Sequence, residues 1–209
     1  MNLELAQSIV GGLSEPSKMP CYGFSIPAKR CKTGAKLRKV NGSICSICYA
    51  LKGRYVFGIV KRALDRRFSK LSHPKWVRAM AFLIKHVEKS GFFRWHDSGD
   101  VQSLSHLKRI VAVCKLTPNV QHWLPTREYG IVSHYIRTLG AFPDNLTVRL
   151  SAYMVDGPPP SHLAKSLGLT TSGVWEDGFT CPAYSQGNKC LDCRACWNKK
   201  HANVNYKAH

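Results

Sequence analysis

The sequence is poor in acidic residues and has no long hydrophobic run. Its 209 residues carry 12 Asp and Glu against 31 Lys and Arg, a formal net charge of +19. The longest apolar stretch, from Val77 to Ile84, is interrupted by Arg78 and is too short to cross a bilayer. The start at Met1 lacks the basic residues and apolar stretch of a signal peptide. We therefore expect a protein of the reducing cytoplasm, without a membrane span and without disulfides.

The positive charge is concentrated in the first part of the chain. Residues 1–90 carry 18 Lys and Arg against 4 acidic residues, whereas residues 91–209 carry 13 against 8. A field of this strength favours a polyanionic partner, because binding to phosphates releases counterions. A solvated basic surface is the alternative. We predict nucleic acid, DNA or RNA, as the partner of this set: Lys29, Arg30, Lys32, Lys36, Arg38, Lys39, Arg54, Lys61, Arg62, Arg66 and Arg67.

Four cysteines lie close together near the end of the chain: Cys181, Cys190, Cys193 and Cys196. Three of them follow one another at two-residue intervals, as in the loops that bind iron-sulfur clusters. Structural zinc sites more often use two separate C-x-x-C knuckles. The spacing favours an iron-sulfur cluster, with zinc as the alternative.

A second group of cysteines lies near the start: Cys21, Cys31, Cys45 and Cys48. Two separate sites, each with four thiolates and of the [4Fe-4S] type, are the simpler interpretation, and one shared site is the alternative. The ninth cysteine, Cys114, follows an apolar helical stretch and is interpreted as a buried thiol without a metal.

The hydrophobic pattern between the two cysteine groups predicts a parallel α/β fold. Strands are expected from Phe92, from Asn119, from Asn145 and over 173–175, and helices over 56–71, 74–89, 103–115, 129–139 and 161–167. This alternation is typical of a partial α/β barrel or an open parallel sheet. We expect one domain of residues 1–209, with a basic cysteine-rich segment over 1–55, the α/β core over 56–178 and a cysteine-rich segment over 179–209.

Polar residues follow three of the predicted strands. The carboxyl ends of parallel strands share one edge of the sheet, where such folds place their sites. His96, Asp97 and Asp100 follow the first strand, Arg127 and Glu128 the second, and Arg149 lies in the third. An imidazole between carboxylates can transfer protons, and an arginine can bind a carboxylate or phosphate. The alternative is structural: helix caps and a buried ion pair.

The chain resembles a family of bacteriophage proteins called Gene product 88. The resemblance rests on five stretches: Cys45-x-x-Cys48-Tyr49-Ala50 with Gly53-Arg54-Tyr55, 93–100, 123–128, 190–197 and Tyr206-Lys-Ala-His209. It implies a phage protein in the cytoplasm of the host cell and no particular activity.

The order of the segments is more distantly similar to that of radical S-adenosylmethionine enzymes, which implies a similar α/β barrel. Those enzymes bind their cluster through C-x-x-x-C-x-x-C, which leaves one iron open to the nucleoside cofactor. This sequence has no such triplet, and Cys45 and Cys48 supply only its last interval. If Cys21 and Cys31 complete a shell of four thiolates with them, no iron is open, whereas binding by only three of the four would leave one iron open.

The sequence leaves three candidate functions. The first is an iron-sulfur protein with mainly structural clusters and a basic surface that binds nucleic acid. The second is a divergent radical S-adenosylmethionine enzyme that uses the residues at the strand ends. The third is a nucleic-acid-binding module in which zinc replaces the clusters. The sequence leaves open whether a reaction is catalysed.

Overall fold

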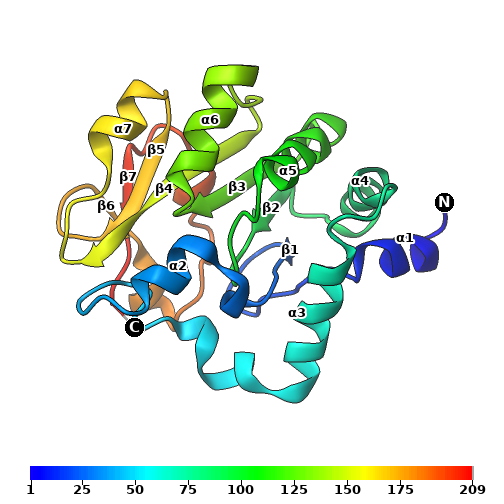
Figure 1. Ribbon diagram of the computed structural model, residues 1–209, viewed down its shortest axis with the longest axis horizontal. Helices are drawn as coiled ribbons and strands as arrows, with labels where there is room; N and C mark the ends of the chain where they lie inside the picture. The colour runs from blue at the N-terminus through cyan, green and yellow to red at the C-terminus, as the bar shows by residue number, and fades with distance from the viewer. Residues whose placement is uncertain (209) are drawn as a thin grey trace.

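The computed structural model describes residues 1–208 and is organised around a seven-stranded sheet, shown in Figure 1. The spatial order is β1-β2-β3-β4-β5-β7-β6, and every pair is parallel. The strands are β1 (Gly23–Phe24), β2 (Phe92–Trp95), β3 (Gln121–Thr126), β4 (Leu146–Val155), β5 (Thr170–Val174), β6 (Phe179–Thr180) and β7 (Asn203–Asn205). The linear order ends at β1 and β6, so the sheet is open.

Five helices pack into one core with the sheet: α1 (Leu3–Val10), α4 (Trp76–Val87), α5 (Leu104–Leu116), α6 (Tyr129–Leu139) and α7 (Ser161–Ser166). They lie along the upper and right-hand side of the view in Figure 1. The strands supply the other half of this core, because side chains alternate between the two faces of the sheet. Examples are Phe93 and Trp95 from β2 and Leu124 from β3. Each fully buried large apolar side chain contributes about 1.5–3 kcal/mol.

The opposite face of the sheet is covered by parts of the two cysteine-rich segments, around Cys21 and over residues 179–206. Trp197, in a 3-10 turn over Ala195–Trp197, packs against the rings of Phe92 and Trp123 at centroid distances of 5.4 and 5.3 Å. After β1 the chain forms α2 (Lys32–Leu37) and two 3-10 turns over Tyr49–Leu51 and Gly53–Val56, and then enters α3 (Gly58–Lys70). These segments lie in the lower half of Figure 1.

The parallel α/β fold predicted from the sequence is confirmed, and helix α6 occupies the range predicted for it. The helix predicted over 103–115 is also present as α5, and the Ser103 hydroxyl caps it by accepting the amide of His106 at 3.1 Å. No helix was predicted within residues 1–55, but α1 begins after an Asn2 cap and buries Ala6, Ile9 and Val10. The short strands β1, β6 and β7 were not predicted. Of the helices in residues 1–208, none is long and apolar enough to span a membrane.

Candidate metal centres

Three cysteines after β1 form one group, which we call the N-terminal trio: Cys31, Cys45 and Cys48. Gly34 of α2 lies against two of these cysteines. A Cβ atom on this glycine would lie 3.5 Å from the sulfur of Cys45 and 3.7 Å from that of Cys31. Cys48 follows in a tight turn in which its amide donates to the carbonyl of Cys45 at 3.4 Å. Burial raises the pKa of the Cys31 thiol, and together with the charges of Asp100, Cys48 and Cys45 it brings this pKa to about 12.

The trio lies at the carboxyl end of the sheet. The amide of Ile44 donates to the carbonyl of Tyr153 near the end of β4 at 2.9 Å, and the amide of Val155 donates to Gly42 at 2.8 Å. The chain before Cys45 is thereby held against the last residues of β4. The predicted edge of polar residues and the N-terminal trio therefore belong to one site.

Asp100 joins the ends of β2 and β3 beside the trio. Its carboxylate accepts the Thr126 hydroxyl at 2.6 Å and the amides of Arg127 and Val101 at 2.9 and 2.7 Å. Burial raises the pKa of Asp100 to about 6, although these three hydrogen bonds oppose the shift. Asp100 is thus held rigidly where it faces the trio.

Arg127 and Glu128 hold the other side of the site. Burial raises the pKa of the Cys45 thiol and Arg127 lowers it, so this guanidinium also faces the trio. Its Nε donates to the carbonyl of Ala152 at 3.0 Å. Glu128 instead accepts the amide and hydroxyl of Thr33 at 2.8 and 2.9 Å, which fixes the start of α2 and with it the loop of Cys31. Glu128 positions the trio and does not form the predicted ion pair with Arg127.

The structure places His96 in the core between the sheet and the helices, away from the site. Its ring is 3% exposed and lies 6.4 and 5.3 Å from the rings of Phe24 and His106. Within the described part of the chain neither ring nitrogen has a hydrogen-bond partner. Burial lowers the pKa of His96 well below its usual value. The interpretation of His96 as a proton carrier at the strand ends is therefore withdrawn.

Asp97 is engaged by two tyrosines. Its carbonyl accepts the Tyr49 hydroxyl, and its carboxylate accepts the Tyr55 hydroxyl at 2.5 Å. The two rings meet edge to face, with centroids 5.7 Å apart. Asp97 therefore fastens the segment after Cys48 to the end of β2.

Cys21 does not belong to the trio. It packs with Cys181, Cys193 and Cys196 in one cluster around Trp197. The amide of Cys190 donates to the carbonyl of Lys18 at 3.0 Å, which brings the fifth thiol to the same place. The structure thus divides eight cysteines into the N-terminal trio and a five-cysteine group: Cys21, Cys181, Cys190, Cys193 and Cys196. Cys114 is fully buried in the helix-side core, as predicted.

Arg149 cannot bind a ligand in the way that the sequence predicted. Its side chain is fully buried, and its guanidinium donates five hydrogen bonds of 2.8–3.0 Å to backbone carbonyls. Four of the acceptors belong to the C-terminal segment, at Ala195, Cys196, Asn198 and His201. Arg149 is an anchor that fixes this segment to the sheet.

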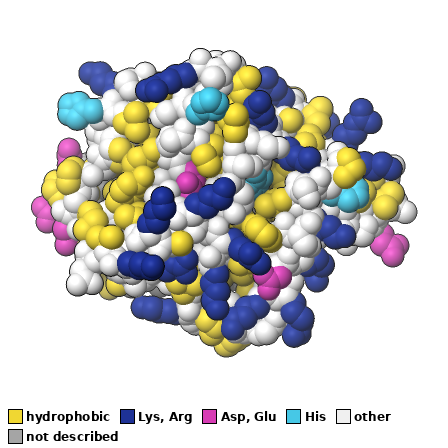
Figure 2. Space-filling view, in the orientation of Figure 1, with side chains coloured by type: hydrophobic (Ala, Val, Ile, Leu, Met, Phe, Trp, Pro, Cys, Tyr) yellow, Lys and Arg dark blue, Asp and Glu magenta, His cyan; other side chains and the backbone are white. Residues whose placement is uncertain are grey.

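Most of the predicted basic surface is exposed. Nine of its side chains lie on the surface: Lys29, Arg30, Lys32, Lys36, Lys39, Arg54, Lys61, Arg62 and Arg66. Figure 2 shows Lys and Arg side chains over the lower part of the face, where α2 and α3 lie in Figure 1. Arg38 is half-buried. Arg67 is buried and donates to the carbonyls of Gly12 and Leu13 at 3.1 and 2.6 Å, so it is removed from the predicted set.

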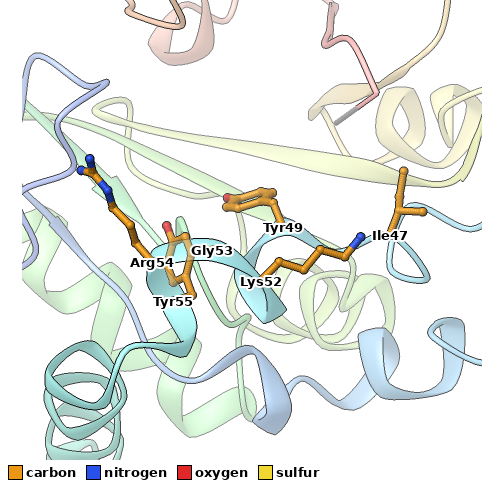
Figure 3. Close-up of a pocket in the computed structure, with 6 residues that line it drawn as sticks. All are labelled: Ile47, Tyr49, Lys52, Gly53, Arg54 and Tyr55. Atoms are coloured by element: carbon orange, nitrogen blue, oxygen red, sulfur yellow. The ribbon is translucent and has the colours of Figure 1, made fainter.

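A pocket of about 350 Å³ opens beside the trio. It is lined by Ile47, Tyr49, Lys52, Gly53, Arg54 and Tyr55, and two of these residues flank Cys48. Figure 3 shows the Lys52 side chain reaching toward Ile47, whereas Arg54 points to the opposite side. The volume lies at the lower end of the range for small-molecule sites.

The cysteines are the candidate ligands for the metal that the sequence predicts. Across residues 1–208, no group of three or more His, Cys, Asp or Glu side chains is arranged to hold a single metal ion. All nine cysteines are free thiols, so both groups are available.

Sequence reasoning missed two residues that shape this site, Thr33 and Gly34. The signal for Gly34 is its place three residues after Cys31, where a helix brings the two side chains to one face. Thr33 gave no such signal, because its partner Glu128 lies 95 residues further along the chain.

The fold and the candidate site define the class of this protein: an α/β protein with a parallel sheet and a group of cysteines after the first strand. The family model for Gene product 88 matches residues 3–168, and the chain therefore belongs to this family of bacteriophage gene products. The matched region includes the trio but ends before Cys181, and His209 of the closing motif lies outside the described residues. Neither the curated proteins nor the solved structures contain a match to the chain.

Proposed function

We propose that this protein is a phage-encoded iron-sulfur enzyme of the radical S-adenosylmethionine type, acting in the host cytoplasm. The observation that carries the proposal is the position of Cys21, which packs with the C-terminal thiols and leaves three at the N-terminal site. Three thiolates leave one iron of a [4Fe-4S] cluster open, and a fourth would have closed it. An open iron can bind the nucleoside cofactor and supply the electron for radical chemistry.

The surroundings of the trio support this proposal. Cys31, Cys45 and Cys48 follow β1 and lie at the carboxyl end of a parallel sheet, where α/β enzymes bind their ligands. The pocket beside Cys48 has room for a small organic molecule. Asp100 and Arg127 face the thiols, and each has a fixed orientation from its hydrogen bonds.

The test is the binding of S-adenosylmethionine to anaerobically purified protein. Isothermal titration should detect binding, and the electron paramagnetic resonance signal of the reduced cluster should change when the cofactor is added. Cys48→Ala should lose the iron of this site and both responses, whereas Cys114→Ala should retain them. A fully loaded protein whose resonance signal is unaffected by the cofactor would refute the open iron. A colourless protein that contains zinc would favour the zinc-stapled nucleic-acid module instead.

We also propose that the exposed basic surface binds nucleic acid. Its support is the accessibility of nine cations around α2 and α3, beside the proposed site. The affinity for a labelled single-stranded oligonucleotide, DNA or RNA, should fall steeply between 50 and 200 mM salt. Lys36→Glu with Lys39→Glu should reduce the slope of log affinity against log salt by about 1.4, from about 0.7 per lost contact.

The matched control is Lys108→Glu with Lys115→Glu, which changes the net charge equally on exposed residues of α5. If both pairs weaken binding to the same extent, only the overall charge acts and the surface around α2 has no special role.

A further inference from the structure

The five-cysteine group lies on the face of the sheet opposite the helices and joins the two ends of the chain. Cys21 precedes β1 at one edge of the sheet, whereas the other four thiols follow β5. Three observations bring them together: the shared packing around Trp197, the hydrogen bond from Cys190 to Lys18, and the anchoring of residues 195–201 by Arg149. The sequence alone paired Cys21 with the wrong group.

Cations surround these thiols. Burial raises the pKa of Cys21 and Cys190, whereas Arg94 and Arg194 lower both values. Arg94 lies over the ring of Trp123 at 4.5 Å, and its Nε is buried without a hydrogen-bond partner among the described residues. Glu88 raises the pKa of Cys21 and so opposes the effect of the two arginines. Its carboxylate accepts hydrogen bonds from the amide of Tyr22 at 2.6 Å and from the hydroxyl of Ser90. Both arginines are half-buried, and positive charge beside thiols favours their deprotonated, metal-binding form.

Further polar groups point at the same place. The Cys196 sulfur lies 3.3 Å from the Tyr206 hydroxyl oxygen. The indole nitrogen of Trp197 donates to the carbonyl of Phe93 at 2.9 Å, which closes the site on the side of β2. Hydrogen bonds to sulfur and limited solvent access are the features by which proteins tune iron-sulfur clusters.

We infer that the five-cysteine group binds a second iron-sulfur cluster, with Cys21 as one ligand and three of the four C-terminal thiols as the others. With four thiolates this cluster has no open iron, in contrast to the one proposed at the N-terminal trio. Its role is to fasten the C-terminal segment across the sheet, because metal binding in such sites contributes folding free energy. The inference depends on the contacts of Cys21 and stands whether or not the trio binds S-adenosylmethionine.

The test compares Cys21→Ala, Cys45→Ala, the double variant and Cys114→Ala, all purified anaerobically. Wild type should contain about eight irons and eight sulfides for two clusters. Each of the first two variants should lose about half of both, the double variant nearly all, and Cys114→Ala none. If Cys21 belonged to the trio, the double variant would lose no more than Cys45→Ala, and the inference would be wrong. Full iron in Cys21→Ala, or zinc in place of half the iron, would also overturn it.

A second measurement does not require the variants to fold. Wild type is treated with increasing chelator and then alkylated, and the modified cysteines are mapped by mass spectrometry. Cys21 should become reactive at the same chelator concentration as Cys190 and Cys193. Reactivity that follows Cys31 and Cys45 would contradict the inference. Limited proteolysis of the same samples should show cleavage after residue 178 only once the second cluster is lost.

Discussion

Replacing Gly34 by alanine adds one methyl group beside the thiols of Cys31 and Cys45. The new Cβ would lie 3.0 Å from the Cβ of Cys31, 3.5 Å from the sulfur of Cys45 and 3.7 Å from the sulfur of Cys31. The first contact is closer than side chains normally allow, so one of the cysteines has to move. Gly34 has no positive φ, which means that alanine meets no backbone strain there.

The effect on folding should be small. Gly→Ala at a compatible helical position stabilises a protein by about 0.4–1 kcal/mol, and overpacking a buried position costs about 1–3 kcal/mol. The free energy of unfolding should therefore fall by at most about 2.5 kcal/mol, against the 5–15 kcal/mol typical of a domain. The protein should stay folded, while the displaced thiols no longer bind a cluster.

The assay is iron and sulfide analysis together with thermal unfolding of anaerobically purified protein. Gly34→Ala should lose about half of the iron, because the five-cysteine group retains its own cluster. The control is Gly130→Ala in α6, where the added Cβ has nothing within 4 Å. A Gly34→Ala protein with full iron content and unchanged stability would refute our account of where the three thiolates meet.

Three further predictions test the supports of the sites. Arg149→Lys should lower the free energy of unfolding by about 3 kcal/mol or more, because buried carbonyls lose their donors, whereas Arg137→Lys on the surface of α6 should have no effect in the same denaturation assay. Glu128→Ala should reduce the iron bound by the trio, by no more than the double variant Thr33→Val/Gly34→Ala does, as measured by iron analysis. An unchanged iron content would show that the hydrogen bonds between Glu128 and Thr33 do not position Cys31. Burial lowers the pKa of His122 to about 3, so only the unfolded state takes up this proton as the pH falls below about 6.5. His122 should then contribute about 2 kcal/mol to the loss of stability between pH 6.5 and 5, and His122→Gln should show a shallower dependence than the wild type in denaturation curves.

The fold could be predicted because its signals are local. Apolar periodicity marks α4, α5 and α6, and the change from apolar to polar residues marks the ends of β2 and β3. The two-residue strands β1 and β6 have no comparable pattern, since their form depends on a neighbouring strand. Helix α1 was missed because Gly11 and Gly12 masked a short helix that packs against α4.

The site could be predicted only in part, because sequence spacing does not report on distant contacts. Asp100 and Arg127 were expected beside each other, since strand ends in a parallel sheet share one edge, and the Asp100 carboxylate accepts the Arg127 amide. His96 and Arg149 are also polar, but the side chain of His96 lies among the rings of the core and that of Arg149 lies against the C-terminal segment. The difference lies in the side of the sheet on which each side chain emerges, and His96 leaves the regular alternation with φ of +57°.

The position of Cys21 follows from the topology of the sheet. Because β1 lies at one edge and β6 and β7 at the other, the C-terminal chain has to cross the face of β3 and β4 before its thiols can reach Cys21. Trp123 on β3 and Arg149 on β4 lie along that path, and they hold the segment through a ring contact with Trp197 and hydrogen bonds to its backbone. Ordering such a segment costs about 1–2 kcal/mol per residue in backbone entropy, which a few anchors alone do not offset over its whole length. A second cluster ligated from both ends of the chain would supply the missing stabilisation, and it would do so only when the sheet between them is already formed.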